Sequence, residues 1–326
     1  MPLRGHVNVA VTLVALLLGD GVARVQAQAQ AQDYPSRLIR VVVGPGPDLV
    51  ARLFGPKMSE TLGVQVVVEP RPGAGGVIAA QTVATAKPDG YTLLLATASY
   101  TINTALGTSP YDLRKQFASI AHASISPFIL IVHPSVPAKT VPELIALAKS
   151  KPGTLNFPSS GIGTPPHLAG ELFKSMADID LVHIPFKEAN SALNAVVSGA
   201  VQMMFSISST TTSQIDAGTV RALGVTTLNP TPLVRGVPAI AQSGLPGFEV
   251  TGWNGFVAPA GTPPAIVAKI NSAIMRGLDD AELRQKLEAT GYEPVPQNTA
   301  EDFGHFIGAD TERWISIVEK ANIRSR

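Results

Sequence analysis

The sequence contains no cysteine, and this absence excludes several kinds of chemistry at once. Without a thiol there is no disulfide, no cysteine nucleophile, no thiolate ligand for a metal and no attachment point for a lipoprotein anchor. The 6 histidines are spread along the chain without a His-x-x-x-His pair, and no Gly-x-Ser-x-Gly segment is present. We therefore expect neither a metal site nor a cofactor.

Charged residues are also scarce, at 15% of the 326 residues, and the formal net charge is +1. Electrostatic binding of nucleic acid requires a basic surface, so we expect no nucleic-acid partner. Hydrophobic residues make up 45% of the chain, which is enough for a large core and argues against disorder. At roughly 100–200 residues per domain, the length allows two domains.

Long apolar segments are absent as well. The run from Val7 to Leu18 is short for a membrane span, and Arg4 precedes it. Small residues alternate with glutamine from Val25 to Ala31, which is typical of a signal-peptide cleavage site. We expect residues 1–31 to be a signal peptide and the mature protein to be soluble and periplasmic. An uncleaved anchor is the alternative.

Strands and helices alternate along the rest of the chain, which is typical of an α/β fold. The nearly all-apolar segments Ile39–Val43, Thr92–Ala96 and Phe128–Val132 are predicted as strands of a sheet that is covered on both faces. The longest predicted helices are Ala265–Leu278 and Ala300–Lys320.

The most informative segment is the loop Asn156-Phe-Pro-Ser-Ser-Gly-Ile-Gly-Thr-Pro-Pro-His167, between a predicted strand and a predicted helix. Thr164 is a good N-cap, because its hydroxyl can accept a hydrogen bond from a first-turn amide, and Pro165 suits the first helical position. The free amides of such a helix start favour a carboxylate or a phosphate. The residues expected to contact this guest are Ser159, Ser160, Gly161, Gly163 and Thr164.

A plainer interpretation of the same loop is a helix start without a ligand. The tetrapeptide Gly-Thr-Pro-Pro recurs at Gly261–Pro264, where it opens another helix. The two serines and the spaced glycines distinguish the first copy. The glycine-rich segment Arg71–Gly76 lacks the Gly-Lys-Ser/Thr ending of a phosphate loop, so we expect it to pack tightly against the sheet.

Several larger side chains have two interpretations each. His167 is expected to cap or pack more than to bind a ligand, and Lys187 either reaches the site or stays solvated. Phe205 and Trp253 either stack on a ligand ring or fill the core, and we favour the core. The run Ser206–Ser213 is predicted as a loop and a helix cap.

Many short segments of the chain together resemble those of one family. They are Ile39-Arg-Val-Val-Val, Asp48-Leu-Val-Ala-Arg-Leu, Arg71-Pro-Gly-Ala-Gly-Gly, Lys87-Pro-Asp-Gly-Tyr-Thr-Leu-Leu, Pro142-Glu-Leu-Ile-Ala-Leu-Ala-Lys, Gly163-Thr-Pro-Pro-His-Leu, Gly170-Glu-Leu-Phe, His183-Ile-Pro-Phe-Lys and Pro259-Ala-Gly-Thr-Pro. Their order and spacing resemble the Bug-type periplasmic solute-binding proteins, the extracytoplasmic receptors of tripartite tricarboxylate transporters. The resemblance covers nearly all of the mature chain.

The resemblance implies a two-lobed periplasmic binding protein of type II, a Venus flytrap with two crossover strands. Lobe one would comprise residues 33–132 and 251–326, and lobe two residues 133–250. The crossovers would be Phe128–Val132 and Thr251–Val257. In the family, backbone amides, hydroxyls and ordered water from both lobes bind the ligand carboxylate in the cleft.

By position, the resemblance also implies ligand contacts at Ala98 and Ser99 and in the Gly44–Asp48 turn, at Pro47 and Asp48. The other candidate ligand contacts are His167, Phe186, Lys187, Phe205 and Ser206. The segment Gly44–Asp48 is a few residues shorter than the first loop of the family, which would alter one wall of the cleft. Ser206 stands where the family often has an aspartate, which disfavours an amino-acid ligand and leaves a plain carboxylate.

We therefore expect a monomeric receptor, not an enzyme, that captures a dicarboxylate or an aromatic carboxylate for membrane transporter subunits or for a sensor kinase. Two alternatives stay open. One is a periplasmic hydrolase that pairs Ser159 or Ser160 with His167. The other is a receptor that has lost its ligand through the short first loop.

Overall fold

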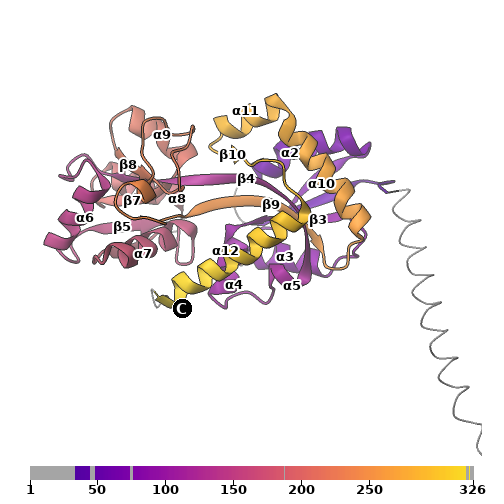
Figure 1. Cartoon of the computed structure of the whole chain (residues 1–326), viewed down its shortest axis with the longest axis horizontal. Coiled ribbons are helices and arrows are strands. Elements are labelled where there is room, and N and C mark those ends of the chain that lie inside the picture. The colour runs from indigo at the N-terminus through magenta and orange to yellow at the C-terminus, as the bar shows by residue number, and fades with distance from the viewer. Residues whose placement is uncertain (1–33, 45–47, 74–75, 187, 321–322, 324–326) are drawn as a thin grey trace, which may run out of the picture.

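The computed structural model describes residues 34–44, 48–73, 76–186, 188–320 and 323. It consists of two α/β halves that lie side by side and are joined by long strands (Figure 1). Strands alternate with helices as the sequence predicted, so the α/β class is confirmed.

A mixed sheet forms the core of the first half. Its strands lie in the order β10 (Glu293–Pro294), β4 (Phe117–Val132), β9 (Thr251–Pro259), β3 (Thr92–Thr97), β1 (Ile39–Val43) and β2 (Val66–Pro70). β1 is parallel to β2 and β3, whereas β9 is antiparallel to β3 and β4. Thr97 ends β3 and pairs with Asn254 near the start of β9, so the carboxyl ends of β1–β3 face the second half.

Helices cover both faces of this sheet. Figure 1 shows α2 (Leu49–Leu62), α10 (Pro264–Asp279) and α11 (Ala281–Ala289) on one face, with α3 (Val77–Ala84), α4 (Ala98–Ala105), α5 (Leu113–Gln116) and α12 (Ala300–Lys320) on the other. Along β1, Val41 packs toward α2 and α10, while Val42 packs toward α3 and α4, because successive side chains of a strand point to opposite faces. Covering both faces explains why β1 is apolar at every position but Arg40.

The second half is built on the far end of β4. The last residues of this strand pair with β7 (Met203–Ile207) and β8 (Arg221–Val225), and a parallel pair, β5 (Asn156–Ser159) and β6 (Val182–Pro185), lies beside β7. The helices of this half are α6 (Val141–Ser150), α7 (Pro165–Ala177), α8 (Ala189–Val197) and α9 (Ser208–Asp216), with the short η2 (Ile240–Gln242). Phe128 pairs with Ile207, so β7 ends at the first half.

The clearest differences from the sequence predictions are in β4 and α9. A strand was predicted only at Phe128–Val132, but β4 begins at Phe117 and has 16 residues. Its pairing with β9 shifts at two bulges, which break the alternation that would have revealed it. Helix α9 begins at Ser208, inside the run Ser206–Ser213 that was predicted as a loop and a cap, so that prediction was wrong. Serine and threonine are weak helix formers, so tertiary contacts and not local propensity make this segment helical.

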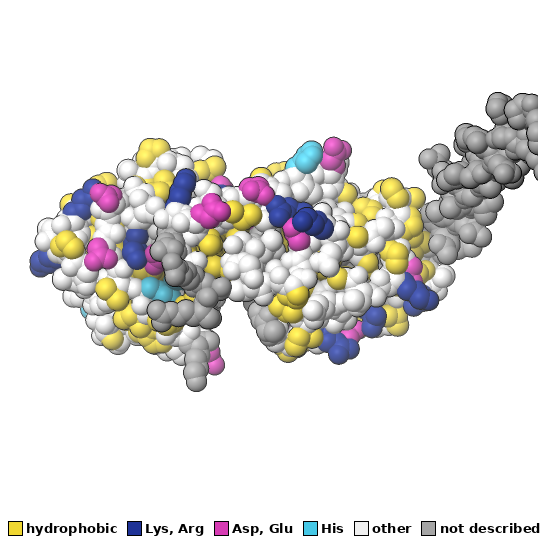
Figure 2. All heavy atoms as spheres, turned by 90° about the horizontal axis from the view of Figure 1, so that it is seen from below, with side chains coloured by type: hydrophobic (Ala, Val, Ile, Leu, Met, Phe, Trp, Pro, Cys, Tyr) yellow, Lys and Arg dark blue, Asp and Glu magenta, His cyan; other side chains and the backbone are white. Residues whose placement is uncertain are grey.

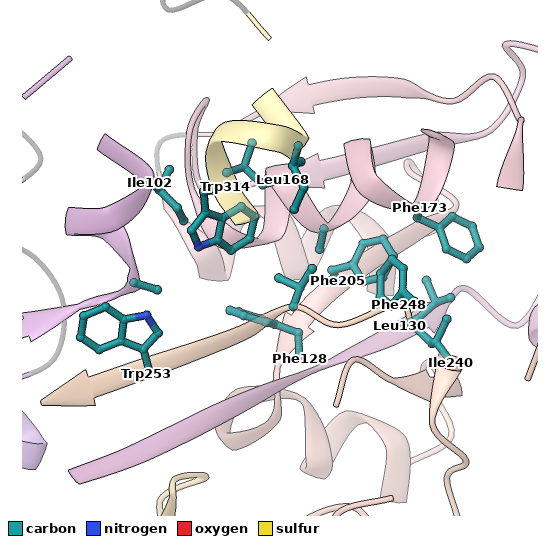
Figure 3. Packing of buried hydrophobic residues seen from close by; sticks show 14 of the residues in the cluster. Ile102, Phe128, Leu130, Leu168, Phe173, Phe205, Ile240, Phe248, Trp253 and Trp314 are labelled. Carbon is teal, nitrogen blue, oxygen red and sulfur yellow. The ribbon is translucent and has the colours of Figure 1, made fainter. Parts of the chain in front are cut away.

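The two halves also meet away from the strands. Ile102 of α4, Trp314 of α12 and Leu168 of α7 are fully buried in one cluster (Figure 3). Toward β10, the Ser208 hydroxyl donates a 3.2 Å hydrogen bond to the carbonyl of Gly291. Helix α12, assigned to the first half by sequence, therefore contributes to the contact between both halves.

Candidate functional site

The carboxyl ends of strands from both halves converge at the junction. The segments after β1, β2 and β3 approach it from the first half, and those after β5, β6 and β7 approach it from the second. Figure 2 shows the surface hollowed between the halves, with the described Lys, Arg, Asp and Glu side chains scattered over this face. The carboxyl ends of strands are where α/β sheets bind ligands.

Most of the residues predicted from the sequence lie on these segments. Pro47 and Lys187, and most of the shortened loop between Gly44 and Asp48, fall outside the described residues. Ala98 and Ser99 open α4, and the side chain of the N-cap residue Thr97 makes no capping hydrogen bond. Ala98 is buried, and Ser99 is partly exposed.

Tyr100, which sequence reasoning missed, lies beneath the stems of two of these segments. Its side chain is buried, and its hydroxyl has no hydrogen-bond partner among the described residues. A Cβ at Gly44 would overlap this hydroxyl, and a Cβ at Gly76 would lie 3.1 Å from it. Burial, followed by the nearby Tyr111, raises the pKa of Tyr100, so the phenol keeps its hydrogen and is a donor. No local pattern distinguishes this tyrosine.

Asp48 is the N-cap residue of α2, but its side chain makes no capping hydrogen bond. The carboxylate instead accepts a 2.8 Å hydrogen bond from Nε of Arg52, one turn later. This bond lowers the pKa of Asp48, so the group is a carboxylate at neutral pH. A negative charge here repels an anionic guest, and the Arg52 guanidinium partly compensates it.

The β5–α7 loop, residues 160–164, is held by hydrogen bonds within itself. Ser159 is fully buried, and its hydroxyl donates to the carbonyl of Gly161 (2.9 Å) and accepts from the amide of Gly161 (3.1 Å). The Thr164 hydroxyl donates to that same carbonyl at 2.7 Å. Thr164 therefore accepts no first-turn amide, and the predicted side-chain cap was wrong. The two hydroxyls are used inside the loop.

The first turn of α7 offers few donors. Pro165 and Pro166 have no N–H, so the amide of His167 is the first that this helix can present. Ser160 is partly exposed, and Ile162 is 53% exposed at the tip of the loop. Ser160 is thus the hydroxyl of this loop that is open to a guest.

Two histidines lie beneath the loop. His167 is buried, and its Nδ1 accepts a 3.2 Å hydrogen bond from the amide of Gly163. Its ring centroid is 4.1 Å from that of His183 on β6, and Nε2 of His183 lies 2.7 Å from the Ser159 hydroxyl. The expected packing role of His167 agrees with this position. His183 entered the sequence analysis only as part of a motif, because its contacts are made across strands.

Both imidazoles are neutral at neutral pH. Burial, then His183 and Lys174, lowers the pKa of His167 to about 3. Burial, then Lys174, lowers the pKa of His183 to about 4. With Nδ1 of His167 acting as an acceptor, the hydrogen of its neutral ring resides on Nε2, 4.0 Å from Oε1 of Glu171.

The Ser159–His183 contact has the distance of a nucleophile and base, but it lacks the other features of a catalytic site. Ser159 has no exposed surface, and its hydrogen is already donated to Gly161. Among the described residues, no carboxylate forms a hydrogen bond with His183 to orient it. No cluster of ligating side chains in the described part of the chain could hold a metal.

Of the remaining predicted residues, Phe205, Ser206 and Phe186 belong to the second half, and Trp253 lies on β9. Phe205 is fully buried and stacks on Phe248, as a core residue does. Ser206 is buried under α9, and its hydroxyl accepts a hydrogen bond from Thr211. Phe186 is partly buried, and its amide donates a 2.9 Å hydrogen bond to the carbonyl of Ser159. Trp253 is buried, as favoured from the sequence.

Comparison with known proteins decides between a receptor and a hydrolase. Residues 50–323 match the Tripartite tricarboxylate transporter family receptor. A UPF0065 protein of a Pseudomonas species is 34% identical over 312 residues, which is 93% of this chain and 93% of that protein. The chain belongs to this receptor family. Protein BugT of Bordetella pertussis is 28% identical and covers 97% of this chain and 99% of BugT.

Solved structures of family receptors have the same fold. The periplasmic binding protein BugD is 31% identical with a TM-score of 0.73, covering 90% of this chain and 100% of BugD. An R. palustris protein solved with adipate is 31% identical with a TM-score of 0.78, covering 90% and 99%. MatC from Rhodopseudomonas palustris, solved with malate, is 33% identical with a TM-score of 0.74, covering 87% and 100%.

The family assignment confirms the main expectations from the sequence. The chain is a periplasmic solute-binding receptor and not an enzyme, which removes the hydrolase alternative. The periplasmic binding protein fold is confirmed too. None of the helices in the described residues has the length and hydrophobicity that crossing a membrane requires.

Proposed function

We propose that this receptor binds a small dicarboxylate at the junction of its two halves and delivers it to a tripartite tricarboxylate transporter. The observation that carries the proposal is the convergence of strand ends from both halves on the hollow between them. Family members of known structure bind adipate and malate, which are dicarboxylates of similar size.

Neutral donors at the junction are suited to a carboxylate guest. The start of α4 at Ala98 and Ser99 has no side-chain cap, and Ser160 and the buried phenol of Tyr100 add hydroxyl donors. A charge-assisted hydrogen bond contributes about 1.5–3 kcal/mol, and a helix start adds up to about 2 kcal/mol. A few such bonds offset an association cost of roughly 4–15 kcal/mol.

The two halves are the two lobes in this proposal, with residues 33–132 and 251–326 in lobe one and residues 133–250 in lobe two. Strands β4 and β9 connect them and act as the hinge. Residues 1–31, outside the described part, are the signal peptide that directs export. The receptor is a monomer, and its partner is a transporter membrane subunit; a sensor kinase is the other partner class that the resemblance allowed.

Calorimetric titration of the mature protein with adipate and malate tests the proposal. We expect a dissociation constant in the micromolar range or below for at least one dicarboxylate. Hexanoate and dimethyl adipate are matched controls, because they have one or no free carboxylate, and both are expected to bind at least tenfold more weakly. Binding of sugars or cations without binding of any organic acid would overturn the proposal.

A further inference from the structure

Two backbone amides of the β5–α7 loop donate hydrogen bonds inward to side chains that lie beneath the loop. The amide of Gly163 donates to Nδ1 of His167, and the amide of Gly161 donates to the hydroxyl of Ser159. Both glycines have positive φ angles, 130° for Gly161 and 78° for Gly163, so the loop is wound tightly at these two points.

The two acceptors are connected through the rings of His167 and His183, which are in contact at an interplanar angle of 41°. His183 approaches the Ser159 hydroxyl at 2.7 Å through Nε2, and its ring lies on that of His167. The single hydroxyl hydrogen of Ser159 goes to the carbonyl of Gly161, so His183 donates from Nε2 to the oxygen. One chain of contacts therefore leads from β6 through two imidazoles to both glycine amides.

Other groups around His167 are few and identifiable. Glu171 and Lys174 face it from its own helix, and they pair with each other at 3.0 Å. Leu106, which follows the last residue of α4, lies against the loop: a Cβ at Gly163 would lie 2.8 Å from its Cδ1. The loop is thus confined between an apolar side chain and an imidazole acceptor.

We infer that His167 and His183 are positioning residues for ligand binding: they fix the amides of Gly161 and Gly163 inward and thereby present Ser160 and Ile162 at the junction. This inference rests on the proposed function for its ligand, but the loop geometry itself can be measured without one. Neither histidine needs to touch the ligand.

Amide hydrogen exchange of ¹⁵N-labelled protein, recorded at Gly161 and Gly163, tests the positioning directly. His167→Leu removes the acceptor and keeps the volume, whereas His167→Asn keeps an acceptor near the position of Nδ1. We expect exchange at Gly163 to accelerate about tenfold in the leucine variant and to stay near the wild-type rate in the asparagine variant. His183→Leu and His183→Gln form the matching pair for Gly161.

The affinities of the same four variants for adipate and malate test whether this positioning affects ligand binding. We expect about tenfold weaker binding in the two leucine variants and rescue in His167→Asn and His183→Gln. Equal effects of both substitutions at a site, or unchanged exchange at Gly163 in His167→Leu, would overturn the inference. A wild-type protein that binds neither acid would contradict the proposed function, while the exchange data would still decide the positioning.

Discussion

The indole N–H of Trp253 on β9 donates a 2.8 Å hydrogen bond to Oδ2 of Asp310 on α12. The same oxygen accepts from the Thr101 hydroxyl (2.6 Å) and from Nε1 of Trp314 (3.1 Å), while Oδ1 accepts from Arg313 (2.7 Å). Asp310 is only 2% exposed. One buried carboxylate therefore ties α4 and α12 to the strand that connects the two halves.

Replacement of Asp310 by asparagine should destabilise the protein strongly. The amide group can accept at only one of its two ends, so at least one buried donor is left unpaired. We expect a loss of about 3 kcal/mol in the free energy of unfolding, measured by urea titration. Glu312→Gln is the control, because Glu312 is 66% exposed and its loss should change stability by less than about 0.5 kcal/mol.

Acid should weaken the fold through its buried histidines. Burial lowers the pKa of His122 to about 4, below the unfolded value of about 6.5. Between about pH 6.5 and 4 the imidazole is therefore protonated in the unfolded chain but not in the folded chain. The free energy of unfolding thus decreases as the pH falls through that range. His122 and His167 should each contribute about 1.4 kcal/mol per pH unit within that range.

His122→Phe tests the contribution of that one ring. His122 stacks on Phe306 with centroids 4.4 Å apart, and Nε2 has no partner among the described residues. Phenylalanine keeps the stacking and has no proton to bind, so urea titrations should show a shallower loss of stability between about pH 6.5 and 4.5. At alkaline pH the variant should be close to wild type; an unchanged acid slope would contradict the assignment to His122.

The Tyr100 hydroxyl should matter for binding and not for folding. Because it is buried without a described partner, Tyr100→Phe should leave stability unchanged or slightly raised. Under the proposed function, affinity for adipate or malate should fall about tenfold, measured by calorimetry. Tyr111→Phe is the matched control: its hydroxyl already accepts from Asn103, so stability should fall slightly and affinity should stay constant.

Gly170 should resist substitution although it lies inside α7. A Cβ there would overlap the ring of Phe157 on β5, so Gly170→Ala forces a backbone or ring shift. We expect a loss of about 1–3 kcal/mol in thermal or urea unfolding. At Gly308 in α12, an added methyl group would enter open space, so Gly308→Ala should instead gain about 0.5–1 kcal/mol from helix propensity.

Helices and strands could be predicted from the sequence where the pattern of apolar residues in a segment reflects which of its side chains are buried. Ile39–Val43 is a strand as predicted, because a strand covered on both faces must be apolar throughout. Helix α12 matches its predicted span, Ala300–Lys320. Helix α4 was missed, since its residues are small, polar or β-branched and only its packing against α12 and β9 fixes its conformation.

The position of the candidate site could be predicted from the sequence, but the hydrogen bonds within it could not. The segment from Ser159 to Thr164 lies at the junction as expected, but the hydroxyls of Ser159 and Thr164 turn inward to Gly161. The Ser159 hydroxyl also contacts His183, which lies 24 residues away on a neighbouring strand. The ligand contacts of the individual residues stay predictions.

The sequence by itself determined the α/β class, the receptor family and the loops that reach the junction, because apolar periodicity and turn residues are local properties of a chain. Tertiary structure alone decided which polar groups remain free for a guest. A hydrogen bond depends on atoms brought within about 3 Å by folding. The contacts of Asp310 with Trp253 and of His167 with His183 therefore cannot be predicted from any short segment of the sequence.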